Sequence, residues 1–316
     1  MEISELRKIS QDNRLMREAS TAFLLAAAVL GLFVLIPRTS PKLVQRAPVA
    51  FVASSTPDAF ANLPITAKAA VVYDLTTRKI LYAKNDRAQL PLASLTKLLT
   101  MYAAFKEFSP TTPITIPQNV MGLSEPHAFT PGQVLPLATL ARLTLTGSLN
   151  DGAAAIAEAT AAQKATNIQS MDASVAASLH LNQTYALNGN GLDLTTMISG
   201  GYGSARDVAV LAGAFAALAP EVASATTHPY AVGTDLEGQQ FTIKNTDRIV
   251  RNVPGLILSK TGYTDLAGGN LALVFDIGVQ HPVAVVILGS TLDARFTDAM
   301  TLVDATFAHF AGVKSL

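Results

Sequence analysis

Hydrophobic residues make up 49% of this 316-residue chain, charged residues make up 15%, and the formal net charge is zero. This composition supplies enough apolar side chains for one large folded domain or two smaller ones. It also argues against nucleic acid as a partner, because the chain carries no excess of basic residues. The chain has no cysteine, which excludes disulfides, zinc–thiolate sites and thiol nucleophiles.

The N-terminal region predicts a membrane anchor. Residues 1–18 form a charged segment, expected to be a cytoplasmic tail, and residues 19–36 form an uncharged apolar run. This run is close to the minimum length of a membrane-spanning helix, about 17 residues. A cleaved signal peptide and a buried soluble helix are the alternatives. The long segment before the run and the absence of a clear small-residue cleavage site after it favour an uncleaved signal anchor. The expected location is the cytoplasmic membrane, with the folded part outside the cytoplasm.

A linker and a folded domain are expected after the anchor. Residues 37–64 contain five prolines and show no hydrophobic period, which is typical of a linker. The folded domain is expected over residues 65–316. It opens with two β-rich runs around "TTRK", a hairpin signal, and continues with a helical pattern over residues 92–108.

The rest of the domain predicts a helical block followed by strands. Residues 135–176 are rich in alanine and leucine, and a further helix is expected to begin after Ser204 as its N-cap. Strands are expected in "QQFTIKN", "GLILSKTG", "GNLALVFDIG" and "HPVAVVILGS", and an amphipathic helix closes the chain. Terminal strands can pair only if the helices are inserted between them. The sequence therefore predicts an α+β sheet domain with a helical subdomain.

Ser94 and Lys97 lie three residues apart in the apolar stretch "PLASLTKLLT". On a helix, residues i and i+3 share one face. A serine hydroxyl needs a nearby base to act as a nucleophile, and a lysine can be that base when burial lowers its pKa. Taken alone, this pair is more simply explained by a lysine that extends its ammonium to solvent.

Two further motifs contain polar residues that could share a cleft. Ser148 and Asn150 lie between two helical runs, where a helix cap is the simpler explanation. Lys260, Thr261 and Gly262 follow an apolar run, where a strand end and turn is the simpler explanation. A lysine and a threonine at that place can instead bind a carboxylate, and a glycine permits close backbone approach.

The three motifs together, S-x-x-K, S-x-N and K-T-G in this order, are the signature set of penicillin-binding proteins and serine β-lactamases. The surrounding segments resemble the low-molecular-mass D-alanyl-D-alanine carboxypeptidases over about residues 65–311. The blocks that carry this resemblance include "PLASLTKLLT", "GSLNDGAAAIAE", "YGSARDVAVLA" and "NTDRIVRNVPGLILSKTGYTDLAG". The resemblance implies the penicillin-binding-protein/β-lactamase-like transpeptidase fold, an antiparallel sheet flanked by helices.

The resemblance also implies a reaction: removal of the terminal D-alanine from peptidoglycan stem peptides through an acyl-enzyme, with β-lactam antibiotics as covalent inhibitors and no cofactor or metal. Ser94 would be the nucleophile, Lys97 its base and Ser148 a proton relay. The backbone N–H groups of Ser94 and Tyr263 would form the oxyanion hole. The residues implied to bind substrate are Asn150, Lys260, Thr261, Gly262, Tyr263 and Arg295. Arg295 has a competing interpretation as a surface residue of the closing helix.

Some features depart from the family pattern. Leu149 replaces the usual glycine of S-G-N, and Gly152 replaces the alanine that follows the motif's aspartate. The chain stops 56 residues after Lys260, whereas many members continue into a β-rich second domain and a C-terminal anchor. This difference keeps a D,D-endopeptidase as an alternative activity.

Other protein classes fit the sequence less well. A class A β-lactamase needs a glutamate for deacylation, and Glu158, Glu221 and Glu237 lack a suitable context. A Ser-His-Asp hydrolase is disfavoured because no G-x-S-x-G occurs and the five histidines are scattered. The glycine-rich runs at 189–191 and 200–203 are interpreted as turns rather than nucleotide-binding loops. A catalytically silent β-lactam or peptidoglycan sensor remains the alternative from a non-enzyme class.

Overall fold

The computed structural model describes residues 13, 16–28, 58–278 and 280–312. The chain divides into two units, residues 1–54 and 55–316, and each is considered by itself. In the first unit, residues 16–28 form a helix. None of the helices within the described ranges is long and apolar enough to cross a membrane. Most of the predicted tail, residues 29–36 of the predicted anchor and most of the predicted linker lie outside the described residues, so these assignments stay predictions.

A five-stranded antiparallel sheet forms the centre of the second unit. Its strands are β1 (Ala69–Asp74), β2 (Lys79–Lys84), β10 (Leu256–Thr264), β11 (Gly268–Asp276) and β12 (Pro282–Ser290). Their order is β10-β11-β12-β1-β2, so the first strand of the domain pairs with the last. The predicted hairpin and the pairing of strands from the two ends of the domain are therefore confirmed. Strand β10 is an edge of this sheet.

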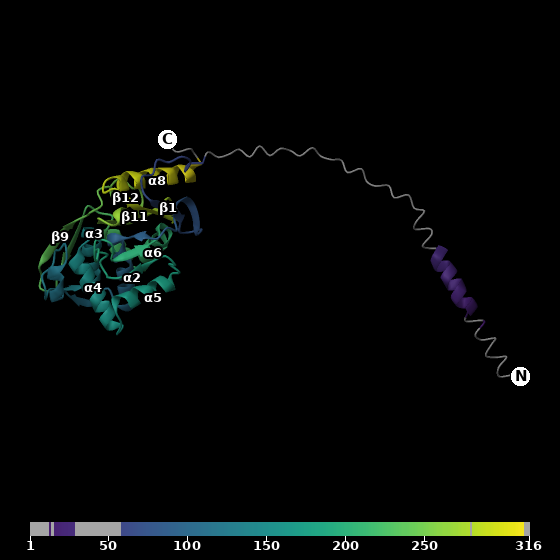
Figure 1. The fold of residues 1–316 in the computed structure, drawn as a ribbon, viewed down its shortest axis with the longest axis horizontal. Helices are drawn as coiled ribbons and strands as arrows, with labels where there is room; N and C mark the ends of the chain where they lie inside the picture. Colours follow the sequence, from purple (N-terminus) through teal and green to yellow (C-terminus); the bar gives the residue numbers. More distant parts are fainter. Residues whose placement is uncertain (1–12, 14–15, 29–57, 279, 313–316) are drawn as a thin grey trace, which may run out of the picture. The chain divides into compact units, whose positions relative to one another are not determined.

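Both faces of the sheet are covered. Side chains alternate between the two faces of a strand, and in β1 every residue is buried. Ala69, Val71 and Tyr73 face one apolar core, whereas Ala70 and Val72 face the other. Helix α6 (Ala205–Leu218) covers the first face and helix α8 (Ala294–Ala311) the second, on opposite sides of β11 and β12 (Figure 1).

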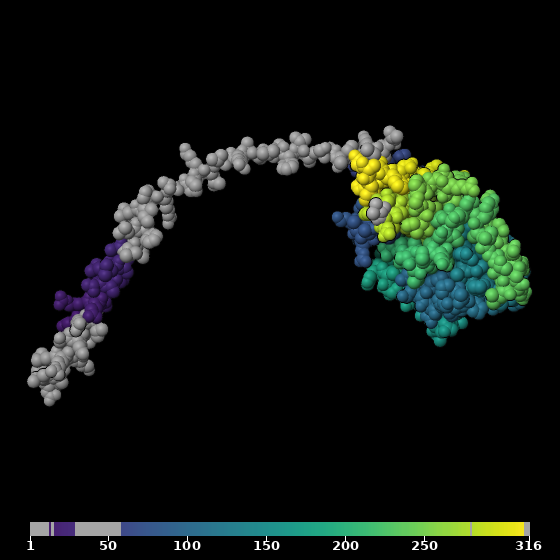
Figure 2. Space-filling view, turned by 180° about the vertical axis from the view of Figure 1, so that it is seen from behind, coloured from purple at the N-terminus to yellow at the C-terminus, as the bar shows by residue number. Residues whose placement is uncertain are grey.

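The helical block lies between strands β2 and β10 in sequence, as predicted. It contains α2 (Lys97–Glu107), α3 (Leu137–Gly147), α4 (Asn150–Gln163), α5 (Ile168–Ser178) and α7 (Pro220–Ala225), together with α6. Ser204 caps α6, as predicted, because its hydroxyl accepts a hydrogen bond from the Asp207 N–H. Figure 2 shows the C-terminal elements in yellow at one end of this unit and the blue and teal residues of the helical block at the other.

Several short elements connect these layers, and only one of their strands was expected. Strand β9 (Gln240–Lys244) was predicted and pairs with β8 (Tyr230–Thr234). The short elements that the sequence did not indicate are β3 (Leu90–Pro91), β4 (Pro113–Thr115), β5 (Val134–Pro136), β6 (Tyr185–Ala186), β7 (Gly201–Gly203) and the 3₁₀ turns η1 (Ala93–Thr96) and η2 (Gln118–Gly122).

The folded unit begins earlier than expected. Ala59 and Phe60 are buried, and Phe60 belongs to the core under α8. The Phe60 ring centroid lies 6.0 Å from that of Tyr82 and 5.4 Å from that of His309. The predicted start at Ile65 is therefore too late. Phe60, inside the proline-rich segment, packs into the core of the sheet domain.

Asp172 in α5 gives a prediction about stability. Its carboxylate is fully buried, and no group in the described part of the chain donates a hydrogen bond to either oxygen. Burial raises its pKa well above the ordinary value. The folded state therefore keeps a proton that the unfolded chain loses above about pH 4. The free energy of unfolding decreases as the pH rises from about 4 to the raised pKa of Asp172 in the folded state.

We expect Asp172→Asn to stabilise the protein by on the order of 1–2 kcal/mol at neutral pH and to have little effect below about pH 4. Thermal unfolding of both proteins between pH 3.5 and 8 would check this. An equal difference at every pH would show that the carboxyl charge is not the cause.

Candidate active site

Ser94 lies in a tight turn at the boundary between the sheet and the helical block. It belongs to η1, and Lys97 is the first residue of α2. The prediction that both residues share one regular α-helix is therefore wrong in detail. Ala93 adopts a φ of +47°, a strained value for a residue with a side chain. The turn nonetheless brings Lys97 Nζ to 2.7 Å from Ser94 Oγ.

Gly262 makes close packing against this turn possible. A side-chain Cβ at this position of β10 would lie 2.9 Å from the Leu92 carbonyl oxygen and 3.3 Å from the Ser94 nitrogen. A larger residue would push the edge strand away from the serine. The prediction that a glycine at position 262 permits close backbone approach is thus explained by steric contact with the Ser94 turn. Residues 260–262 lie inside β10. The simpler interpretation, which placed them at a strand end and in the turn after it, is therefore wrong.

Lys97 is completely buried and has three hydrogen-bond partners. In addition to Ser94 Oγ, its Nζ lies 2.8 Å from Asn150 Oδ1 and 2.8 Å from the Asn190 carbonyl oxygen. The side chain does not extend to solvent, so the simpler interpretation of this lysine is excluded. The structure brings Ser94, Lys97 and Asn150 together, as predicted, and adds Asn190.

The partners of Lys97 fix the direction of its lone pair. A neutral amine has two N–H groups and one lone pair, and the Asn190 carbonyl can only accept. Asn150 Nδ2 donates to the carbonyl oxygens of Ser124 and Glu125, at 2.8 and 3.0 Å, so its Oδ1 must face Lys97. Both N–H groups are thereby engaged. The lone pair of neutral Lys97 is left directed at the Ser94 hydroxyl.

The protonation of Lys97 is shifted toward this neutral form. Burial lowers its pKa to about 7, and the negative charge of Asp151 opposes this shift. Asp151 is itself buried, and its Oδ2 accepts hydrogen bonds from the backbone N–H groups of Ala128 and Phe129. Near neutral pH a substantial fraction of Lys97 is therefore an uncharged amine that can accept a proton.

A second serine–lysine pair lies in the same region. Lys260 Nζ in β10 donates to Ser148 Oγ at 2.8 Å and to the Thr261 carbonyl at 2.7 Å. Ser148 sits at the C-cap of α3 with a φ of +58°, and its side chain caps neither α3 nor α4. The capping interpretation of this motif is therefore wrong. The left-handed backbone turns the hydroxyl toward the sheet.

The charge of Lys260 is destabilised. Burial lowers its pKa well below the ordinary value, and the positive charges of Lys97 and Arg295 lower it further, while Asp247 opposes these effects. Asp247 is buried and accepts a 2.5 Å hydrogen bond from Ser259 Oγ. Burial raises the pKa of Asp247. An anionic ligand bound beside Lys260 would favour its protonated, charged form.

Thr261 and Arg295 complete the edge of the site. The Thr261 hydroxyl lies 2.6 Å from that of Thr246. Arg295 is only 7% exposed, so its interpretation as a surface residue is wrong. One of its terminal nitrogens donates to the Gly262 carbonyl at 2.7 Å, and its guanidinium lies over the Phe296 ring. Tyr263, the next residue along β10, is 48% exposed.

The sequence pattern did not indicate every residue of the site. Asn190 was assigned to a glycine-rich turn, and Asp151 and Asp247 were not singled out. Their signal was weak, because the local sequence does not show that these residues lie beside Lys97 and Lys260. Within the described residues, no group of three or more histidine, aspartate or glutamate side chains could hold a metal ion.

Comparison with known proteins identifies the family. The family model for D-alanyl-D-alanine carboxypeptidase matches residues 53–291. The chain is 27% identical to the D-alanyl-D-alanine carboxypeptidase DacF of Bacillus subtilis over 254 residues, covering 77% of this chain and 63% of the relative. It is 28% identical to a D-alanyl-D-alanine endopeptidase of Pseudomonas aeruginosa over 257 residues, covering 76% and 78%.

The fold agrees with this assignment. Penicillin-binding protein D2 of Listeria monocytogenes, solved in its ampicillin-bound form, superimposes with a TM-score of 0.67 at 23% identity, covering 78% of this chain and 99% of that one. The expected penicillin-binding-protein-like α+β fold is confirmed. The chain spans less than two thirds of the length of the Bacillus relative. From the matched family model, the chain belongs to the D-alanyl-D-alanine carboxypeptidase family.

Proposed function

We propose that this protein is a serine-type D-alanyl-D-alanine carboxypeptidase that removes the terminal D-alanine from peptidoglycan stem peptides. The observation that carries the proposal is the buried amine of Lys97, which lies 2.7 Å from Ser94 Oγ and has both N–H groups engaged elsewhere. This is the geometry of a general base next to a nucleophile. The names of the two relatives described above state that they act on a D-alanyl-D-alanine unit.

In the acylation step, neutral Lys97 accepts the Ser94 hydroxyl proton as Oγ attacks the carbonyl carbon between the two D-alanines. The tetrahedral oxyanion would accept hydrogen bonds from the backbone N–H groups of Ser94 and Tyr263. The C–N bond then breaks, and the leaving nitrogen takes a proton. The products are an ester on Ser94 and free D-alanine.

Ser148 supplies the proton route to the leaving amine. Lys260 Nζ donates to Ser148 Oγ at 2.8 Å, so the Ser148 hydroxyl can direct its own proton toward the substrate. The proton taken by Lys97 replaces the one that Ser148 gives up. In deacylation, Lys97 takes a proton from water, which attacks the ester and releases the shortened peptide.

Strand β10 would hold the substrate as an added strand. It is an edge of the sheet and passes the nucleophile at Gly262. The terminal carboxylate would bind Lys260 and Thr261, in the region of positive charge to which Arg295 contributes. Arg295 would act through the Gly262 carbonyl, holding the strand in place. Contact of Asn150 with the substrate amide stays a prediction, because both ends of its amide have protein partners.

The proposal includes inhibition and location. β-Lactams would acylate Ser94, as the ampicillin-bound Listeria structure suggests by likeness of fold. The protein would be held in the cytoplasmic membrane by its N-terminal apolar run, with the catalytic domain on the cell-wall side. Its partners would be the stem peptides of the wall, and its activity would serve wall maturation and cell shape.

A D,D-endopeptidase is the second candidate. It is favoured by the match to the Pseudomonas aeruginosa endopeptidase, of which this chain covers 78%. Digestion of purified sacculi separates the two activities: a carboxypeptidase releases D-alanine from pentapeptides, and an endopeptidase converts cross-linked dimers into monomers.

The proposal is tested with a soluble pentapeptide and a fluorescent penicillin. We expect the purified protein to release D-alanine and to be labelled, and Ser94→Ala to do neither. Labelling without D-alanine release from any peptide would contradict the carboxypeptidase and support a sensor. Absence of labelling would contradict the assignment of Ser94 as nucleophile.

The lowered pKa of Lys97 predicts the pH dependence of acylation. Below about pH 7 the amine is protonated and cannot act as a base. The rate of penicillin acylation should therefore rise about tenfold per pH unit up to that point and then level off. Lys97→Ala should lower the plateau by about 10²- to 10⁴-fold. The control Lys106→Ala, which removes an exposed lysine of the same helix, should not change it.

Asn150→Asp tests the positioning of the amine. The new carboxylate would replace an amide whose oxygen lies 2.8 Å from Lys97 Nζ, and it would raise the pKa of Lys97. We expect the rising limb of the acylation profile to move to higher pH, with circular dichroism confirming that the fold is intact. A limb that stays at the wild-type pH would show that Asn150 does not control the protonation of Lys97.

A further inference from the structure

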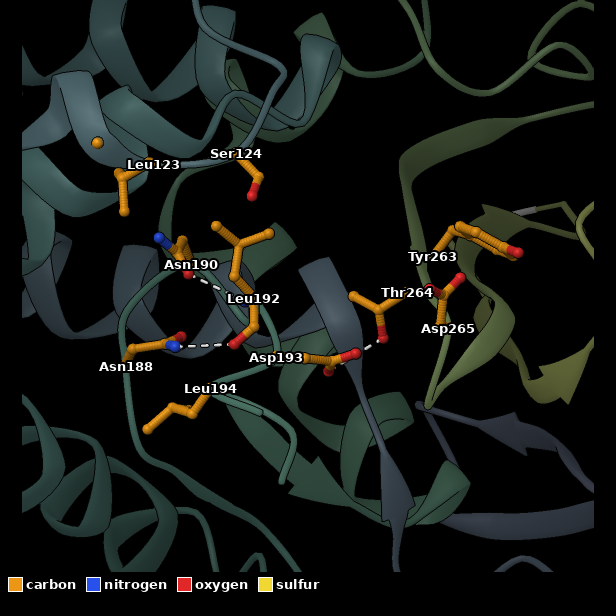
Figure 3. A pocket seen from close by; sticks show the side chains of 11 residues that line it. Leu123, Ser124, Asn188, Asn190, Leu192, Asp193, Leu194, Tyr263, Thr264 and Asp265 are labelled. Atoms are coloured by element: carbon orange, nitrogen blue, oxygen red, sulfur yellow. Dashed lines mark hydrogen bonds between the residues drawn. The ribbon is translucent and has the colours of Figure 1, made fainter. Parts of the chain in front are cut away.

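The domain has a cavity that the catalytic site does not use. The cavity drawn in Figure 3, between the 188–194 segment and the end of β10, belongs to the site already described, and there the Thr264 hydroxyl donates to Asp193 at 3.1 Å. A different cavity, of about 450 Å³, is formed by the β1–β2 hairpin, the end of α5 and helix α6. The two cavities share no lining residue.

This different cavity, the hairpin cavity, lies far from Ser94. It is lined by Tyr73 of β1, a strand three positions away from β10 in the sheet, which is roughly 14 Å at about 4.8 Å per strand. The strand registers place Tyr73 level with Leu258, four residues before Gly262, and therefore roughly 13 Å further along the strands. A ligand in the hairpin cavity would touch neither serine–lysine pair.

Two guanidinium groups line the hairpin cavity without a protein partner. Arg78 lies in the turn between β1 and β2, and Arg206 lies in the first turn of α6. Neither side chain forms an ion pair or a hydrogen bond within the ranges that the structure describes. Asp207 also lines the cavity, but its carboxylate is buried and accepts from the Gln183 N–H at 2.7 Å and the Thr184 hydroxyl at 3.0 Å. The lining therefore keeps a net positive charge.

Neutral polar groups and an apolar wall complete the lining. Tyr73 is only 7% exposed, and its hydroxyl has no hydrogen-bond partner among the described residues, so it is free to donate to a ligand. His180, which follows α5, adds an imidazole. The apolar wall consists of Leu75, Val210 and Ala214. The hairpin cavity thus combines cationic donors, a hydroxyl and an apolar surface.

These groups suit an organic phosphate. A guanidinium binds phosphate or carboxylate oxygens through paired N–H donors. A phosphate monoester carries about −1.5 to −2 charges at pH 7 and has three strong acceptor oxygens, so it can bind two guanidinium groups and a hydroxyl at once. A carboxylate has a single charge and two oxygens. The volume lies in the usual range of small-molecule pockets, about 300–1,000 Å³, which leaves room for an organic group beside the apolar wall.

We propose that the hairpin cavity is a separate ligand site that binds a small phosphate monoester with an apolar body. Arg78 and Arg206 pair with the phosphate oxygens, and the Tyr73 hydroxyl donates to a third oxygen. The apolar body packs against Leu75 and Val210. The site is independent of the chemistry at Ser94.

Titration of the full-length chain with phenyl phosphate, followed by calorimetry, tests this site. Phenyl phosphate supplies both the phosphate and an apolar ring. We expect saturable binding that weakens when salt is added. Inorganic phosphate lacks the apolar body, and benzoate lacks the higher charge and the third oxygen. Each should therefore bind at least about fivefold more weakly than phenyl phosphate.

Substitutions in the lining locate the bound phosphate. Arg78→Gln and Arg206→Gln should each weaken the binding of phenyl phosphate by about tenfold, and Tyr73→Phe should weaken it by about fivefold. The control Arg251→Gln removes an exposed arginine outside the cavity and should leave the affinity unchanged. Circular dichroism checks the fold of each variant. Arg78 is exposed in a turn, so its variant tests the site even where Arg206→Gln does not fold.

Absence of binding at millimolar phenyl phosphate would overturn the site. An affinity that stays the same in both arginine variants would place the ligand elsewhere, for example beside Lys260, and would overturn it equally. Equal affinity for benzoate would overturn the choice of phosphate, and equal affinity for inorganic phosphate would overturn the role of the apolar wall. None of these measurements depends on D-alanine release, so their outcome is separate from that of the proposed function.

Discussion

The site depends on one buried nitrogen. Lys97 Nζ has no access to solvent, so its proton affinity and the direction of its lone pair are set by the protein alone. Three segments supply that control: the η1 turn with Ser94, the start of α4 with Asn150, and the 188–191 loop with Asn190. Each contributes an oxygen within 2.8 Å, and two of these oxygens, those of Asn150 and Asn190, must accept. Packing of the helical block therefore decides whether Ser94 can become a nucleophile.

The charged groups around this nitrogen affect one another's protonation. Lys97, Lys260 and Arg295 lie close enough for their charges to interact, and each is removed from water. Asp151 and Asp247 offset part of the free-energy cost of burying these charges, because they favour the protonated forms of Lys97 and Lys260. The remaining positive field suits a carboxylate beside β10.

The sequence predicted what depends on local pattern and motif order. The long apolar runs of β10, β11 and β12 and the alanine-rich helices were assigned correctly, because continuous buried segments leave a strong signal. The η1 turn was mistaken for a helix, since its strained Ala93 is stabilised by tertiary packing against Gly191 and Gly262. Asn190 and Asp247 were missed because their positions beside Lys97 and Lys260 come from the tertiary fold and leave no pattern in the local sequence. The burial of Phe60 was not predicted, because a single aromatic residue in a proline-rich segment shows no hydrophobic period.

The two serine–lysine pairs differ in what holds them together. Ser94 and Lys97 belong to one continuous turn, so their distance is fixed by local backbone geometry. Ser148 lies between α3 and α4 in the helical block, whereas Lys260 lies in the sheet, so their 2.8 Å contact crosses between two layers. A small shift of one layer against the other would therefore leave the base beside the nucleophile but would separate the second pair. The Ser94–Lys97 contact is thus a local property, whereas proton delivery to the leaving group depends on the alignment of the two layers.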